Sequence, residues 1–245
     1  MTLAWSVSIE VDPPDDIDDW KYFLQKPFDP WLEERTQNSE HLLLLRTSSF
    51  DGLVTASEVH ERALPILERL NGAFRLSRGF GYGTLRASGA VQIKGDAALA
   101  RYYFLQPQDI AVRVKMSRPS IVVTDAAGNV IPPAPPSPSE VQVWTKVADG
   151  DDVIAELLIH FARCDNWFDL YKTYELLKKR CGGQKLLFGK PWAPEAQVRT
   201  MRETANFYRH ATYPRPKNPM SFDEARAFLQ SMVRSLLGEV QAGEL

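Results

Sequence analysis

Arg209 and His210 are the adjacent residues with the clearest catalytic potential in the sequence. An imidazole can act as general acid or base near neutral pH, and a guanidinium can neutralise charge that builds up on phosphorus. Asn206 and Arg202 precede the pair by about one and two turns of a predicted helix. For RNA cleavage, His210 would act on the 2′-hydroxyl while Arg209 or Arg202 stabilised the phosphorane. Asn206 would position the phosphate, and such a ribonuclease would need no metal and no cofactor.

The same helix carries a polar stripe opposite its apolar residues. The stripe has one basic, one acidic, one amide and one imidazole group at helical spacing, namely Arg199, Glu203, Asn206 and His210. These groups could bind phosphate or pass protons. The alternative is an ordinary solvated face, which is the default for a surface helix.

Positive charge is concentrated around this helix. The chain carries a net charge of −2, but residues 178–217 hold ten basic residues and two acidic ones. The basic residues are Lys178, Lys179, Arg180, Lys185, Lys190, Arg199, Arg202, Arg209, Arg215 and Lys217, and they alternate with aromatic residues such as Tyr208 and Tyr213. Cations interleaved with aromatic rings can hold a sugar–phosphate backbone and stack bases. Alternatively, the cations simply decorate negative helix ends.

Six residues are therefore candidates for substrate binding: Lys178, Lys179, Arg199, Arg215, Lys217 and Glu175. Glu175 could orient His210 or pair with Arg209 if their helices pack together. It could also belong to an ordinary surface cluster with the neighbouring lysines.

Four amphipathic patterns predict the helices that position these residues, within 151–164, 165–183, 194–211 and 221–239. Asp165 or Asn166 is a predicted N-cap, Gly182 a left-handed stop, and Ser221 with Glu224 a capping box. In the third helix, Val198, Met201, Ala205 and Tyr208 share one apolar face, and the fourth helix is expected to end at Gly238. The spacing predicts a helical bundle over 140–245.

The N-terminal part, residues 1–131, is predicted to be a β-rich α+β domain. A Pro-rich linker over 132–139 separates it from the bundle. Alternation of Trp5, Val7, Ile9 and Val11 predicts a half-buried strand. Further strands are expected at 41–50, 72–79, 84–95, 101–106, 110–116 and 120–131, with helices at 15–24 and 55–70, the second stopped by Asn71-Gly72. The glycines of 79–85 indicate a hairpin turn.

Composition indicates a reduced, cytoplasmic protein. Two cysteines are too few for a disulfide scaffold or a zinc site. The N-terminus lacks the features of a signal peptide, and no apolar run is long enough to span a membrane. The net charge of −2 provides no global attraction to nucleic acid, so any nucleic-acid binding depends on the local charge described above.

The stretches "WFDLYKTYELLKK", "RETANFYRHA" and "MSFDEARAFLQSMVRSLL" resemble a group of uncharacterised bacterial proteins with a β-rich and a helical part. More distantly, the bundle is similar to HEPN domains, which are often dimeric and include many RNases of toxin and phage-defence systems. Their signature places Arg and His four to six residues apart. Here Ala205, Thr204 and Glu203 occupy the positions where that Arg would precede His210.

The resemblance implies an RNA-directed effector or nucleic-acid-binding module, active in bacterial stress or phage defence and assembled as a homo-oligomer. The alternative is a non-catalytic interaction or scaffold protein whose helical bundle dimerises.

Overall fold

A computed structural model describes the chain except for residues 1–2, 38–39, 95–96, 104–135, 211 and 244–245. The chain divides into two compact units. The first comprises Met1–Leu64 and Tyr82–Gln142, and the second comprises Pro65–Gly81 and Val143–Leu245. The strands predicted at 110–116 and 120–131 lie outside the described residues, as does the first half of the predicted linker, 132–135. The domain boundary at 132–139 stays a prediction.

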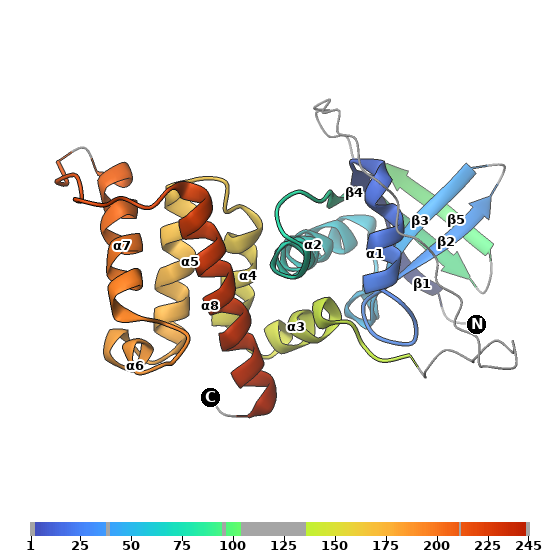
Figure 1. The fold of residues 1–245 in the computed structure, drawn as a ribbon. Coiled ribbons are helices and arrows are strands. Elements are labelled where there is room, and N and C mark those ends of the chain that lie inside the picture. Colours follow the sequence, from blue (N-terminus) through green and yellow to red (C-terminus); the bar gives the residue numbers. More distant parts are fainter. Residues whose placement is uncertain (1–2, 38–39, 95–96, 104–135, 211, 244–245) are drawn as a thin grey trace, which may run out of the picture. The chain divides into compact units, whose positions relative to one another are not determined.

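In the described part of the first unit, five strands form one antiparallel sheet in the order β2-β3-β1-β4-β5 (Figure 1). The strands are β1 (Leu3–Asp12), β2 (Trp31–Gln37), β3 (Glu40–Arg46), β4 (Thr84–Lys94) and β5 (Ala97–Tyr103). With the helices of the C-terminal part, this sheet confirms the predicted α+β class.

Strand β1 lies in the middle of the sheet, and its central residues 5–9 are buried on both faces. Trp5, Val7, Ile9 and Val11 are buried as their alternation predicts. The intervening Ser6 and Ser8 are buried as well, so the prediction of a half-buried strand was wrong. Burial of a strand in the middle of a sheet depends on what the rest of the fold places over each face. The alternation of residues within the strand does not report this.

Residues of a short helix and the turn before it hydrogen-bond to Gly83, the residue that precedes β4. The 3-10 turn Pro14–Asp16 leads into α1 (Ile17–Phe23), which confirms the helix predicted at 15–24. Trp20 Nε1 donates to the Gly83 carbonyl at 3.0 Å, and the Asp16 carboxylate accepts from the Gly83 amide. Residues 79–83 therefore connect a helix to a strand, and the predicted hairpin turn was wrong.

Gln142 closes the loop that precedes β2. Its side-chain amide Nε2 donates to the carbonyls of Gln25, Phe28 and Pro30 at 3.0, 3.1 and 2.8 Å. Gln142 is 1 % exposed, so these bonds satisfy carbonyl groups that have little access to water.

Helix α2 (Ala56–Arg78) is longer than predicted and contributes residues to both units. Asn71-Gly72 does not stop it, and the strand predicted at 72–79 was wrong. A Cβ at Gly72 would lie 2.7 Å from the Leu158 carbonyl carbon, so the hydrogen of glycine permits a close approach of two helices. Tertiary packing explains this glycine, whereas its local sequence indicates a helix end.

The segment after Gly72 is held in the second unit by a ring between two cations. Phe80 has the guanidinium carbons of Arg75 and Arg226 at 4.9 and 4.3 Å from its centroid. Both guanidinium groups also contact Asp165, at 3.2 and 3.6 Å. The carboxylate offsets the repulsion between the two cations, so the four side chains form one mutually stabilising cluster.

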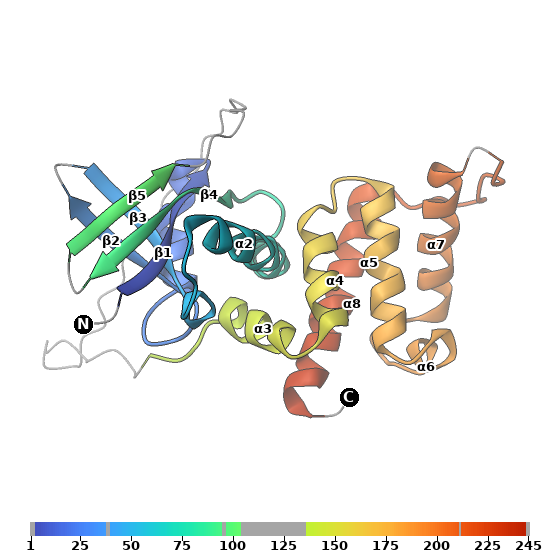
Figure 2. The same ribbon diagram turned by 180° about the vertical axis from the view of Figure 1, so that it is seen from behind.

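The second unit is built around α5, which contacts α4, α6, α7 and α8. Its helices are α3 (Glu140–Asp149), α4 (Asp152–Ala162), α5 (Trp167–Arg180), α6 (Gln184–Phe188), α7 (Glu195–Arg209) and α8 (Phe222–Ala242). Figures 1 and 2 show α4, α5, α7 and α8 running side by side. None of the helices in the described part of the chain is long and apolar enough to cross a membrane.

Most of the predicted helix ends in this unit are confirmed. Asn166 caps α5 by accepting from two backbone amides, Gly182 takes a positive φ after it, and Ser221 with Glu224 forms a capping box on α8. Helix α8 continues past Gly238 to Ala242, so the predicted end was wrong. Gly243, with a φ of +74°, provides the stop instead.

Candidate functional site

Helices α5 and α7 are antiparallel neighbours. Near the start of α5, the Trp167 ring stacks on Tyr208 near the end of α7, with centroids 5.0 Å apart and an interplanar angle of 5°. Beyond the other end of α5, Gln184 accepts a hydrogen bond from Arg202 Nη1 at 3.2 Å. The basic stretch that is continuous in sequence is therefore divided between opposite ends of the helix pair.

One end of this pair carries an exposed cluster, which we call the aromatic–arginine surface. It consists of Trp167, Phe168, Tyr171, Tyr208 and Arg209. Phe168 and Tyr208 are 61 % and 52 % exposed, large values for rings of this size. Tyr208 was predicted on the buried face of its helix, but it lies at the edge of that face and covers Trp167 instead.

The guanidinium of Arg209 lies over the rings of this surface. Its guanidinium carbon is 3.9 Å from the Tyr171 centroid and 5.6 Å from that of Phe168. In the described part of the chain it makes no ion pair, and its buried Nε has no hydrogen-bond partner. The two rings restrict the guanidinium, and no carboxylate of the described residues neutralises its charge, so the group is positioned to receive an anion.

Arg202 occupies the same side of α7 two turns earlier. Besides its bond to Gln184, it lies beside Tyr174, whose hydroxyl is buried without a partner in hydrogen-bond geometry. Burial raises the pKa of Tyr174, and the nearby positive charge of Arg202 opposes that shift. Arg202 is half-exposed, and its hydrogen bond to the Gln184 amide oxygen restricts the guanidinium.

Among the described residues, three of the ten cations have carboxylate partners. Arg180 pairs with Asp151 at 2.6 Å, Lys190 with Glu239 at 2.7 Å, and Arg199 with Glu195 at 2.5 Å. Asp151 and Glu239 lie outside residues 178–217, so a count of charges within that stretch misses them. The count therefore overestimates the positive charge that the stretch presents. Arg199, a predicted binding residue, is largely neutralised by its neighbour on the same helix.

The other predicted residues are spread over the unit. His210 is exposed and caps the end of α7, where its backbone amide donates to the Asn206 carbonyl at 3.0 Å. Glu175 is half-buried and pairs, in the described part of the chain, with neither Arg209 nor His210. The four remaining cations among the predicted binding residues are exposed or half-exposed and form no ion pair with a described residue. Two lie near the end of α5 and two beyond α7: Lys178, Lys179, Arg215 and Lys217.

The sequence patterns did not assign Phe168 or Tyr171 to a site. Helical spacing placed Trp167 and Tyr171 on an apolar face, yet both are half-exposed. One sequence feature could have indicated the aromatic–arginine surface: three aromatic residues occur within the five positions 167–171. They cannot all point to one buried face of the helix.

Other reactive side chains are held in structural roles. His160 Nδ1 lies 3.2 Å from Asp169 and ties α4 to the first turn of α5. Burial raises the pKa of Cys164 to about 12 and that of Cys181 to about 11, so neither thiol is a nucleophile near neutral pH. Among the described residues, no three His, Cys, Asp or Glu side chains lie close enough together to hold a metal ion.

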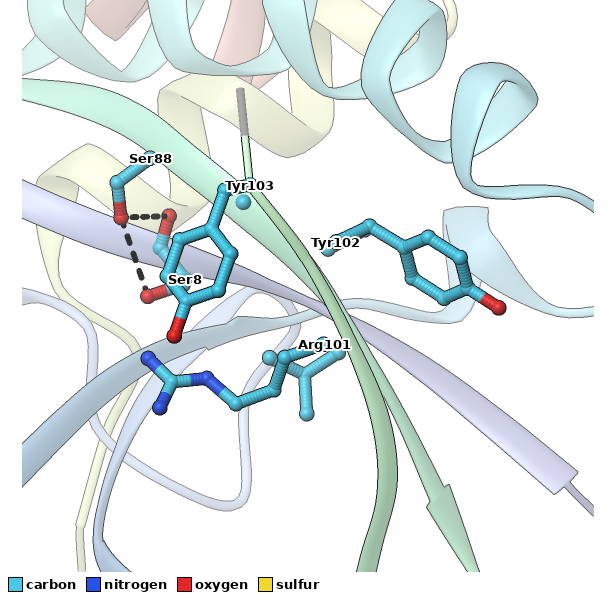
Figure 3. A pocket seen from close by; sticks show the side chains of 8 residues that line it. Ser8, Ser88, Arg101, Tyr102 and Tyr103 are labelled. Atoms are coloured by element: carbon cyan, nitrogen blue, oxygen red, sulfur yellow. Dashed lines mark hydrogen bonds between the residues drawn. The ribbon is translucent and has the colours of Figure 1, made fainter. Parts of the chain in front are cut away.

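The first unit has a small hollow where β1, β4 and β5 meet (Figure 3). Ser88 Oγ donates to the Ser8 carbonyl at 3.2 Å, and Arg101 lies over the Tyr103 ring at 5.1 Å. Figure 3 shows Tyr102 pointing away from the hollow. The hollow has a volume of about 10 Å³, which is enough for one water molecule. It is therefore too small to bind a substrate.

The fold and site define an α+β protein whose helical unit presents unneutralised arginines beside exposed aromatic rings. No family model, no curated protein and no solved structure matches the chain. The relationships to bacterial two-part proteins and to HEPN domains therefore stay expectations from the sequence.

Proposed function

We propose that the helical unit binds single-stranded nucleic acid, with RNA as the expected ligand, through the aromatic–arginine surface. The observation that carries the proposal is Arg209, whose guanidinium carbon lies 3.9 Å from the Tyr171 centroid beside the exposed Phe168 and which, among the described residues, has no carboxylate partner. A cation fixed next to an accessible ring can contact a phosphate while the attached base stacks on the ring. Only an unpaired base exposes its face for stacking, which favours a single strand over a duplex.

A HEPN-like four-helix bundle over residues 140–245, acting in bacterial stress or phage defence, is part of this proposal. The antiparallel packing of α5 and α7 supports it. The proposal is limited to binding, because Arg202 donates to Gln184 on α6, whereas His210 follows the last residue of α7, about two turns further along the helix. Cleavage by that pair would require them to meet at one phosphate.

The test is the affinity for a fluorescent single-stranded RNA, measured by anisotropy at low and high salt. Phe168→Ala should weaken binding about fivefold or more, since removing one base-stacking ring costs about 1–3 kcal/mol. Leu186→Ala is the matched control, because Leu186 is 60 % exposed on α6, away from this surface. Duplex RNA of the same sequence should bind more weakly than the single strand.

Absence of binding at low salt, or equal losses in the two variants, would refute the proposal. The second candidate function is self-association of the helical unit, which is favoured by the exposure of Phe168 and Tyr208. In that case, sedimentation velocity should show a dimer that Phe168→Ala dissociates, and RNA binding should be absent.

A further inference from the structure

One side of α7 carries two arginines with an amide between them. Arg202, Asn206 and Arg209 are four and three residues apart, so they follow one another along the helix surface. The two arginine positions are separated by about 10 Å along the helix axis. This span suits two nearby phosphates of one strand better than a single phosphate.

Both guanidinium groups are oriented by uncharged neighbours. Tyr171 lies under Arg209 at 3.9 Å, and the Gln184 amide oxygen accepts from Arg202 at 3.2 Å. The acids nearest to them in the helices are Glu175 and Glu203, and in the described part of the chain neither forms an ion pair with Arg202 or Arg209. Two fixed, unneutralised cations on one helix side are therefore available to phosphates.

Asn206 lies between these cations with its side-chain amide uncommitted. Its backbone carbonyl accepts from the His210 amide at 3.0 Å, but among the described residues its side chain makes no hydrogen bond. It is half-exposed. The amide can both donate and accept, as can the ribose 2′-hydroxyl, which is the group that distinguishes RNA from DNA.

We propose that this side of α7 binds one internal segment of single-stranded RNA. Arg202 and Arg209 each contact a phosphate, and the Asn206 side chain contacts the ribose 2′-hydroxyl between them. The inference rests on the proposed function and deepens it, because it assigns the ligand to RNA and sets the number of phosphate contacts made by α7.

The number of phosphate contacts can be measured from the salt dependence of RNA binding. For single strands, the slope of log K against log salt changes by about 0.7 for each phosphate contact. Arg202→Gln and Arg209→Gln should each reduce the magnitude of the slope by about 0.7. Arg202→Lys is the matched control: it retains the charge and should retain the slope. Far-ultraviolet circular dichroism of each variant checks that the helices remain folded.

The sugar contact is tested with RNA and DNA strands of equivalent sequence. Asn206→Ala should weaken RNA binding about three- to tenfold, as expected for loss of one hydrogen bond, and leave DNA binding unchanged. The wild-type protein should prefer RNA by a similar factor.

The possible failures separate the two proposals. If the wild-type protein binds neither strand, the proposed function is refuted. If it binds RNA but Arg202→Gln leaves the salt slope unchanged, the two-phosphate assignment is overturned and the proposed function stands. Equal affinity for RNA and DNA would overturn the role of Asn206. Binding of an acidic peptide in place of either strand would indicate a protein ligand and overturn both proposals.

Discussion

Replacing Gly72 with alanine tests whether α2 and α4 pack as closely as the structure shows. The added methyl carbon would lie 2.7 Å from the Leu158 carbonyl carbon and closer still to its oxygen. Ordinary contact between carbon atoms is about 3.5–4.0 Å, so the methyl group is about 1 Å too close. The obstacle is helix backbone, which cannot rotate aside as a side chain can, so the two helices would have to separate.

Two opposing effects set the magnitude. Alanine stabilises a helix interior by about 0.5–1 kcal/mol relative to glycine. Overpacking costs about 1–3 kcal/mol, and a clash with backbone belongs at the upper end of this range. The expected net loss is about 2 kcal/mol, or about 4–8 °C in the melting temperature of a chain of this length.

Gly238→Ala is the matched control. This glycine also lies within a helix, α8, but a Cβ there would have no heavy atom of another part of the structure within 4 Å. Only the gain in helix propensity applies, so Gly238→Ala should raise stability by about 0.5–1 kcal/mol. Thermal and urea unfolding of both variants measures the difference. If Gly72→Ala proved as stable as Gly238→Ala, the close approach of α2 to α4 would be wrong.

Three further predictions concern individual side chains. Hydrogen bonds from the Ile154 amide and Arg180 outweigh burial and lower the pKa of Asp151, so Asp151→Ala should cost about 1–2 kcal/mol at neutral pH. Because the pKa of Asp151 is lower in the folded protein than in the unfolded chain, its carboxylate stabilises the fold at pH values above the unfolded-state pKa of about 3.9. The cost of Asp151→Ala should therefore shrink when unfolding is measured below that pH. A cost that does not depend on pH would contradict the assignment. Gln142→Leu should lower the stability of the first unit by about 1–3 kcal/mol in urea titrations, because three carbonyls lose their donor, and an unchanged midpoint would show that water replaces it. Cys164 and Cys181 are buried with raised pKa values, so thiol labelling at pH 8 should be slow in the folded protein and fast in denaturant, and rapid labelling of the native chain would refute their burial.

The helices of the second unit were predictable because their start and stop residues act locally. Asn166, Ser221 with Glu224, and Gly182 make the capping contacts that their positions in the sequence predict. Strand β2 was missed because Glu33, Glu34 and Arg35 interrupt any apolar alternation. Charged residues are common on an edge strand, which β2 is among the described strands, because they discourage pairing with other chains.

The candidate site was only partly predictable for a different reason. The importance of Arg202 and Arg209 was proposed from sequence, but the neighbours that orient them, Gln184 and Tyr171, come from other elements and depend on tertiary packing. The neutralisation of Arg180 by Asp151 joins residues 29 positions apart, and such pairs leave no local pattern. A count of basic residues along a sequence predicts a positively charged surface only where the fold leaves neighbouring cations without carboxylate partners.

The use of residues 65–81 to complete the second unit has a consequence for synthesis of the chain. This segment emerges from the ribosome early, whereas Leu158 and Arg226, against which it packs, are added much later. At typical elongation rates the delay is on the order of ten seconds. During that time the segment lacks Leu158 and Arg226, so this stretch is the part of the nascent polypeptide where we expect a molecular chaperone to bind.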